Sequence, residues 1–329
     1  MIVSKSRKRL EWVDIAKGIA IILMVVGHEV INPDIRAVIF SFHMPLFFIL
    51  SGYTSSRVNS WQKLGCKAKK SFTHVWLLAV LMVILLGIEN VLFLKDFNFV
   101  NFYQSILKGL FWGSNIPQIN LMSVGVMWFL FVFFWAKLLF DMLQVMLPDV
   151  IIGIVLLLAS GISYLFCNGF RAFLPQALDI VPFAALFMWI GAIAKKTLVA
   201  EKFDKYSKTI LGLALIYWLG CLLGHLYIEM SLRHYPLFIV SIIEAVAGTL
   251  LVCLLSKKMS AARWTNGLRI IGQHTLAVMC IHHLDLYWIN WGSLIHYWPL
   301  SALARLVTDV ALLVCWLLLM KTMHKLRAL

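Results

Sequence analysis

The stretch 14–29 places side chains that could do chemistry inside an apolar run. Asp14, Lys17 and His28 are each costly in hydrocarbon, so each needs a partner, a water-filled cavity or a function. At about 100° per residue on an ideal helix, Lys17 and His28 lie roughly 60° and 40° from Asp14, on the same face. The rise from Lys17 to His28 is about 16 Å. The stretch therefore predicts a membrane helix with charge near one surface and an imidazole near the other. The alternative for Asp14 and Lys17 is a structural ion pair at i,i+3.

Two more predicted helices supply histidines, His43 and His282, at the depth of His28. Imidazole is suited to taking a proton from a hydroxyl near neutral pH, and a nearby carboxylate can orient it. Glu29 is adjacent in sequence, although it can meet His28 only if the helix ends there. Two alternatives remain: interfacial histidines with no shared site, and a metal site of the three histidines, for which no ligand spacing is seen. We predict catalytic roles for His28, Asp14 and Glu29, and substrate binding by His43, His282 and Trp128, which opens another helix on the same side.

A basic cluster, Lys67, Lys69 and Lys70, precedes an apolar run on the opposite side of the membrane. Ammonium groups at the mouth of a cavity attract polyanionic ligands, so a phosphate site is one interpretation. A signal for membrane topology is the other. We expect Lys17 to extend the site inward and Ser51 to line it, although a serine before glycine at a helix end usually bonds the local backbone. A third polar feature, Arg305 and Asp309 at i,i+4, predicts an internal ion pair.

Composition explains why these residues must be carried by membrane helices. Of 329 residues, 62% are hydrophobic and only 13% are charged, whereas a soluble domain is about a quarter charged. The sequence therefore predicts an all-α, polytopic membrane helix bundle. The six cysteines show no metal spacing and are interpreted as small hydrophobic residues. A net charge of +14 is distributed as expected for lipid headgroups and topology signals, not for nucleic acid. The first apolar run lacks a cleavage site and should stay in the membrane.

Apolar runs predict about ten spans within one domain, 1–329, without a soluble extracytoplasmic domain. Residues 95–123 form the longest stretch outside the spans and are interpreted as interfacial or re-entrant cover. Alternate connections hold 22 of the 29 lysines and arginines, Lys137 included, and the others hold five. This asymmetry predicts that both termini are cytoplasmic. The predicted spans are 12–31, 36–54, 72–94, 124–145, 150–167, 176–194, 209–228, 236–256, 269–290 and 300–320.

Five motifs in order resemble the acyltransferase 3 family, in particular its branch of bacterial sugar O-acetyltransferases, often labelled fucose 4-O-acetylase-like. They are DIAKGIAIILMVVGH at 14–28, FHMPLFFILSGY at 42–53, MWFL at 127–130, LPQALDIVPFAALFMWIGAIAKK at 174–196 and IGQHTLAVMCIHH at 271–283. The resemblance implies a ten-helix enzyme of the bacterial cytoplasmic membrane. Its members move an acyl group, usually acetyl from acetyl-CoA, to a sugar hydroxyl of an envelope glycan. The co-substrate is thus acetyl-CoA, no metal is expected, and the partners are the bilayer and a glycan or lipid-linked sugar. Homo-oligomerisation is left open.

The family pattern maps onto this chain residue by residue. A basic residue and a catalytic histidine in the first helix correspond to Lys17 and His28, and a basic pair before the third helix corresponds to Lys67 and Lys70. Lys17, Lys67 and Lys70 stand where many relatives carry arginine. They therefore lack the planar guanidinium group that binds a phosphate through two parallel hydrogen bonds. The implied mechanism has CoA phosphates at the lysines and His28 as general base, favoured over an acylated His28. The alternative class is a transporter or flippase of a glycan-linked lipid. Absence of internal repeats disfavours it, and a transporter would not consume acetyl-CoA.

Overall fold

The protein is described from a computed structural model covering residues 9–93, 99–116, 123–197 and 202–327. Within those ranges it consists of helices, short 3₁₀ or π turns and one isolated β-bridge, between Glu229 and His234. The α-helices are α1 (Glu11–Gly27), α2 (Pro33–Phe40), α3 (His43–Thr54), α4 (Trp61–Ser71), α5 (Leu77–Phe93), α6 (Phe99–Trp112), α7 (Trp128–Met146), α8 (Asp149–Gly169), α9 (Val181–Thr197), α10 (Lys202–Leu223), α11 (Phe238–Met259), α12 (Asn266–Gln273), α13 (Thr275–Trp288), α14 (Trp291–Leu294) and α15 (Trp298–Arg327).

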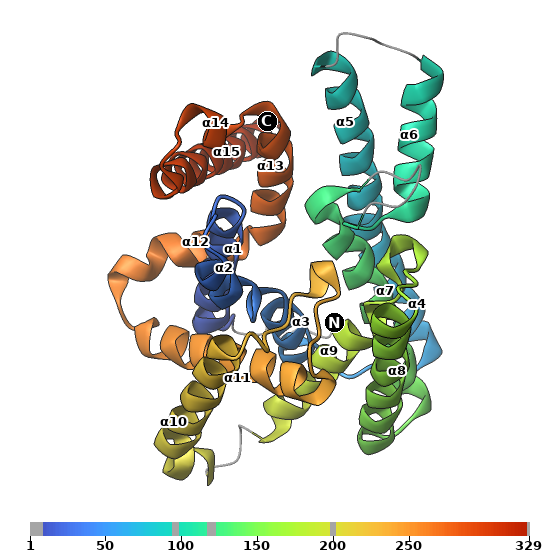
Figure 1. Ribbon diagram of the computed structural model, residues 1–329, viewed down its shortest axis with the longest axis vertical. Helices are drawn as coiled ribbons and strands as arrows, with labels where there is room; N and C mark the ends of the chain where they lie inside the picture. The colour runs from blue at the N-terminus through green and yellow to red at the C-terminus, as the bar shows by residue number, and fades with distance from the viewer. Residues whose placement is uncertain (1–8, 94–98, 117–122, 198–201, 328–329) are drawn as a thin grey trace.

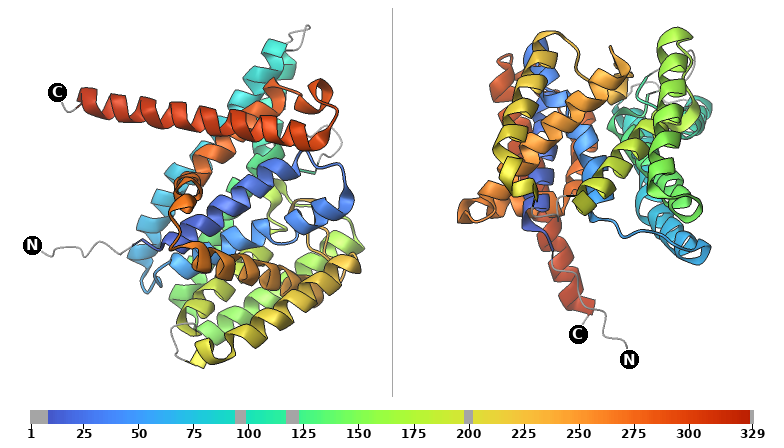
Figure 2. Two further views of the ribbon diagram at one scale, coloured as in Figure 1. Left: turned by 90° about the vertical axis from the view of Figure 1, so that its left-hand side faces the viewer. Right: turned by 90° about the horizontal axis from the view of Figure 1, so that it is seen from below.

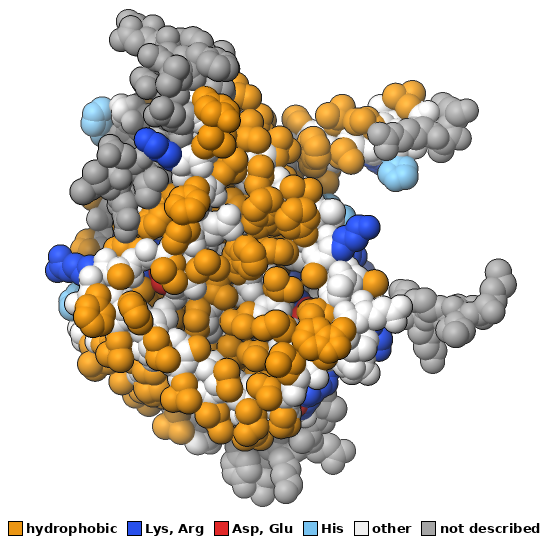
Figure 3. Space-filling model, turned by 90° about the vertical axis from the view of Figure 1, so that its right-hand side faces the viewer, with side chains coloured by type: hydrophobic (Ala, Val, Ile, Leu, Met, Phe, Trp, Pro, Cys, Tyr) orange, Lys and Arg blue, Asp and Glu red, His pale blue; other side chains and the backbone are white. Residues whose placement is uncertain are grey.

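The expected membrane helix bundle is confirmed, because seven helices of the described ranges are long and apolar enough to cross a membrane. Space-filling shows a face covered by hydrophobic side chains, with Lys and Arg at its two margins (Figure 3). Such a belt is what a bilayer requires of the surface it contacts. The seven helices are Pro33–Thr54, Trp61–Ile88, Gly125–Met146, Asp149–Gly169, Pro175–Thr197, Phe238–Met259 and Trp298–Leu326.

The other three predicted spans fall on shorter helices. Span 12–31 corresponds to α1, which has 17 residues. Span 209–228 corresponds to the apolar part of α10, Lys208–Leu223. Span 269–290 is broken at His274, where α12 ends and α13 begins. The count of ten therefore stays a prediction. So does the cytoplasmic location of both termini, although α1 begins and α15 ends on the same side of the molecule (Figure 2).

Two groups of helices flank α1, α2 and α3 (Figure 1). One contains α12 to α15, and the other contains α4 to α9. Helix α1 contacts α3, α11, α12, α13 and α15, so its residues reach both the interior and the C-terminal helices. Within the stretch 95–123, α6 lies beside α5 and projects with it from the body (Figure 1). Residues 94–98 and 117–122 of that region lie outside the described residues.

Glycines allow two close helix crossings that hold α1 and α3 in place. On α1, a Cβ at Gly18 would lie 2.2 Å from the Leu268 carbonyl oxygen of α12. On α3, a Cβ at Gly52 would lie 1.8 Å from the Met188 carbonyl oxygen of α9. Membrane helices approach this closely only where small residues meet, because a larger side chain would occupy the space between the two backbones. Gly52 of the SGY motif therefore has a packing role of its own, and it fixes the helix that carries Ser51.

The connection between α1 and α3 is tight because α2 is capped by its own sequence. The Asn32 side chain accepts hydrogen bonds from the backbone N–H groups of Asp34 and Ile35, and Pro33 occupies the first helical position. Both features are typical of helix N-termini. Helix α2 is followed closely by α3, which begins at His43. The end of α1 and the start of α3 are thereby brought to the same end of the bundle.

Candidate functional site

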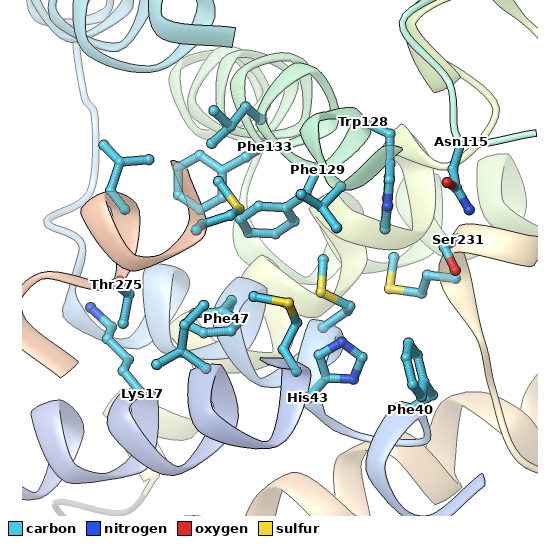
Figure 4. Close-up of a pocket in the computed structure, with 18 of the residues that line it drawn as sticks. Lys17, Phe40, His43, Phe47, Asn115, Trp128, Phe129, Phe133, Ser231 and Thr275 are labelled. Carbon is cyan, nitrogen blue, oxygen red and sulfur yellow. The ribbon is translucent and has the colours of Figure 1, made fainter. Parts of the chain in front are cut away.

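A cavity of about 400 Å³ lies between α1, α3, α7 and α13. Lys17, Ser51 and Thr54 line one end, and Arg36, Asn115, Glu229 and Ser231 line the other. Figure 4 shows Lys17 at one side of the cavity and Trp128, Asn115 and Ser231 at the opposite side, with Phe47, Phe129 and Phe133 between them. The cavity is therefore apolar along its length and polar at both ends. Of the predicted site residues, the structure brings Lys17, His28, His43, Ser51 and Trp128 to this cavity.

His28 and His43 are anchored in the same way. Helix α1 ends at Gly27, and the Nδ1 atom of His28 lies 2.8 Å from the Met24 carbonyl oxygen. The Nδ1 atom of His43 lies 3.0 Å from the Ile39 carbonyl oxygen. Because a carbonyl oxygen only accepts hydrogen bonds, each Nδ1 carries the hydrogen and each Nε2 carries the lone pair. Both rings line the cavity, so each can accept a proton there.

His282 does not line the cavity, so this geometry does not support its assignment to substrate binding, which stays a prediction. Its side chain is fully buried. Its Nε2 atom lies 3.4 Å from Nδ1 of His28, and its Nδ1 atom lies 2.9 Å from the Asp309 carboxylate. The expected Arg305–Asp309 pair is therefore wrong: His282 of α13 binds the Asp309 carboxylate instead, and α13 contacts both α1 and α15. His282 stands behind His28 and contacts it from outside the cavity.

Glu29 is held by α15 and not by His28. The helix does end before Glu29, as the sequence argument required, but its carboxylate accepts hydrogen bonds from Ser301 and, at 2.6 Å, from Arg305. The same guanidinium bonds Asp285 at 2.7 Å. Arg305 is thus a buried cation between two carboxylates, which explains why it is tolerated inside the bundle. These bonds join the end of α1 to α15. They do not support the catalytic role of Glu29, which stays a prediction.

Asp14 also lies away from the reacting histidine. Its carboxylate is 2.7 Å from Nε of Arg9, and Gln273 donates a longer bond of 3.4 Å to it. Fourteen residues separate it from His28, a rise of about 21 Å along a helix. The expected catalytic role is therefore not supported, and Arg9 holds Asp14 in place of the alternative partner, Lys17. The Lys17 side chain instead lines the cavity.

A second cavity, of about 450 Å³, adjoins the first at Thr54, Val75 and Phe133, which line both. It contains the predicted Lys67 and Lys70. It also contains three residues that sequence reasoning missed as site residues: His74, Lys137 and Asp141. Lys137 and Asp141 form an i,i+4 ion pair, and that spacing inside an apolar helix is the signal that could have drawn attention to them. Lys67 donates a 2.8 Å hydrogen bond to the Ser56 carbonyl oxygen.

The polar end beyond His43 is built around an ion pair that the sequence did not reveal. Arg36 lies 2.7 Å from Glu229, and its guanidinium carbon is 4.1 Å from the Phe40 ring centroid. Glu229 forms the isolated bridge with His234, whose pKa is lowered by burial, partly opposed by Glu229. Arg36 and Glu229 are 193 residues apart, so their spacing in the sequence carries no signal.

Trp128 reaches this polar end after a 3₁₀ turn that begins at Gly125, where φ is +55° and favours glycine.

Over the described ranges, no group of three or more His, Cys, Asp or Glu side chains is arranged to hold a metal ion. His28 and His282 approach each other, but His282 turns its other nitrogen to Asp309. The alternative of a three-histidine metal site therefore has no support in this geometry.

A polytopic helical membrane protein with a buried cavity and a histidine on its wall is the class that fold and site define. The chain belongs to the acyltransferase 3 family: the sequence profile described as the Acyltransferase domain matches residues 10–320. The protein is accordingly a membrane acyltransferase. No curated protein and no solved structure matches it significantly.

Proposed function

We propose that this acyltransferase moves an acetyl group from cytoplasmic acetyl-CoA to a hydroxyl of a cell-envelope sugar, in the cytoplasmic membrane of a bacterium. The observation that carries the proposal is the place of His28. Its ring lines the cavity with Nε2 free, between a lysine-bearing end and a polar end of a different character. A general base must reach the proton it removes, and this position offers it to molecules arriving from either end.

The donor end fits a CoA molecule in charge and in shape. The second cavity is lined by Lys67, Lys70 and Lys137, and the first cavity is lined by Lys17 at the adjoining end. CoA carries its phosphates at one end and a narrow pantetheine arm at the other, so a basic chamber joined to an apolar channel suits it. The Lys17-to-His28 rise of about 16 Å along α1 is a distance that such an arm can cover. The thioester would then lie beside His28.

The acceptor end fits a sugar. Trp128 offers an aromatic surface, and His43, Asn115 and Ser231 offer hydrogen-bonding groups around it. Sugar rings present apolar C–H faces and a rim of hydroxyls, so they need both kinds of contact. We assign His43 and Trp128 to this acceptor site.

In the proposed reaction, Nε2 of His28 takes the proton of the acceptor hydroxyl while the oxygen attacks the thioester carbonyl. A carbon–oxygen bond forms, the carbon–sulfur bond breaks, and His28 returns the proton to the departing thiolate. The second route, through an acylated His28, uses the same atom as nucleophile. The anchored Nδ1 orients Nε2 for either route, and we propose the general base because it completes the transfer without a covalent intermediate.

The proposal is tested by comparing the mass of envelope glycans from cells that make the wild-type protein, the His28→Ala variant or neither. We expect additional acetyl groups only with the wild-type protein. Identical glycan masses in all three strains, with the protein present in the membrane, would overturn the proposed function. Consumption of acetyl-CoA by the purified protein separates transferase from transporter.

A further inference from the structure

Two buried side chains from two helices form a line behind His28. His28 follows α1, His282 lies on α13 and Asp309 lies on α15. His282 and Asp309 are both fully buried, and neither lines either of the two cavities described above. Placing an imidazole and a carboxylate at this depth is expensive unless they satisfy each other. The two distances, 3.4 Å and 2.9 Å, make the line continuous.

The partners decide where the hydrogens lie. In its ionised form the Asp309 carboxylate only accepts hydrogen bonds, so Nδ1 of His282 then carries a hydrogen and its Nε2 carries the lone pair. That lone pair faces Nδ1 of His28, whose hydrogen is shared between His282 and the Met24 carbonyl oxygen. All three contacts are consistent with one arrangement of hydrogens, and that arrangement leaves the lone pair of His28 on Nε2.

We infer that His282 and Asp309 are positioning residues, which hold His28 in the tautomer and orientation that a general base needs. The inference rests on the proposed function of His28. When Nε2 of His28 takes the hydroxyl proton, the ring becomes an imidazolium, and its Nδ1–H then bonds a lone pair that the Asp309 carboxylate makes more basic. The line therefore stabilises the charge that develops during transfer. It is a carboxylate-supported base with a second imidazole inserted between base and carboxylate.

The Asp309→Asn variant tests this directly. An asparagine amide can donate to His282, which would move the hydrogen of His282 to Nε2 and set two N–H groups against each other. His28 could relieve this clash only by moving its own hydrogen from Nδ1 to Nε2, and Nε2 would then have no lone pair with which to accept a proton. We expect kcat to fall by about 10²–10⁴-fold, while KM for acetyl-CoA changes by less than about threefold. The Asp309→Glu variant, which keeps a carboxylate, should recover part of the loss.

The His28→Ala protein, which lacks the base, distinguishes a positioning role of Asp309 from a role in folding. In the His28→Ala protein there is no base to position, so adding Asp309→Asn should leave the residual rate unchanged. The matched control is Asp285→Asn, which neutralises another buried carboxylate, one that pairs with Arg305 and not with His282. We expect this control to lower the melting temperature and keep kcat within about threefold of wild type.

Three results would overturn the inference: Asp309→Asn with kcat within about threefold of wild type, equal loss of kcat in Asp285→Asn, or a further loss in the His28→Ala background. If Asp309→Asn fails to fold, His282→Gln decides, with support from at least a tenfold loss of kcat at constant KM and refutation by a rate near wild type. Failure of the proposed function itself looks different, because the wild-type protein would then transfer no acetyl group; failure of the base assignment alone would appear as transfer retained by His28→Ala.

Discussion

Removing Lys67 and Lys70 together tests whether the second cavity binds the donor. Both lysines line that cavity, and both lie on α4 within reach of solvent. An exposed charge pair contributes about 0.2–1 kcal/mol, so two lysines at a CoA phosphate group contribute roughly 0.5–2 kcal/mol. The Lys67→Ala/Lys70→Ala protein should therefore bind CoA about 2- to 30-fold more weakly at low salt. Lys17 and Lys137 remain in place, which limits the loss.

The same helix offers a matched control. Lys63 and Lys69 are exposed residues of α4 that do not line the cavity, and Lys63 bonds the Asn59 side chain. The Lys63→Ala/Lys69→Ala protein loses the same charge from the same helix. Its CoA affinity should fall less than that of the Lys67→Ala/Lys70→Ala protein, because Lys63 and Lys69 do not line the cavity and so make no direct contact with a phosphate bound there.

Isothermal titration of CoA into detergent-solubilised protein at low and high salt measures both pairs. At about 1 M salt the Debye length is only 3 Å, so the difference between the pairs should nearly vanish. An equal effect of the two pairs at low salt, or no effect of either, would reduce Lys67 and Lys70 to topology signals and remove the donor site from the second cavity.

Two further predictions concern the fold. Gly52→Ala places a Cβ against the Met188 carbonyl oxygen and should destabilise the protein by about 1–3 kcal/mol. The control, Gly65→Ala, adds a Cβ in open space and should be neutral or stabilising by about 0.5–1 kcal/mol. Thermal unfolding in detergent compares the two variants, and equal melting temperatures would contradict the close crossing of α3 and α9. A topology reporter fused after Leu329 should be cytoplasmic and one inserted between residues 168 and 169 extracytoplasmic, and reporters on the same side would refute the ten-span layout.

The sequence-based predictions were most successful for residues that lie on a single helix. The periodicity of α1 predicted that Lys17 and His28 share a face, and both line one cavity. The cluster around Lys67 was visible because positive charges mark helix ends, and two of its members line the second cavity. These are local signals, since residues on one helix keep their spacing whatever the tertiary arrangement.

Sequence reasoning did not reach the contacts whose partners come from distant parts of the chain. Arg305 and Asp309 are one turn apart on α15, yet Arg305 bonds Glu29 and Asp285, and Asp309 bonds His282. An i,i+4 spacing permits a pair but cannot exclude a better partner on a neighbouring helix. The Arg36–Glu229 pair had no local signal at all. Depth in the membrane could be predicted for each histidine, but which faces the cavity depends on helix rotation within the bundle.

Acetyl transfer by purified His28 variants, measured beside CoA affinity, tests the central claim most directly. A general base predicts that His28→Ala folds, binds CoA like the wild type and loses transfer by about 10²–10⁴-fold. His28→Gln should fail almost as badly, because an amide can form hydrogen bonds but cannot accept the proton. His43→Ala, assigned to the acceptor site, should lose less. Transfer near the wild-type rate by His28→Ala, with CoA affinity intact, would contradict the assignment of His28 as the base.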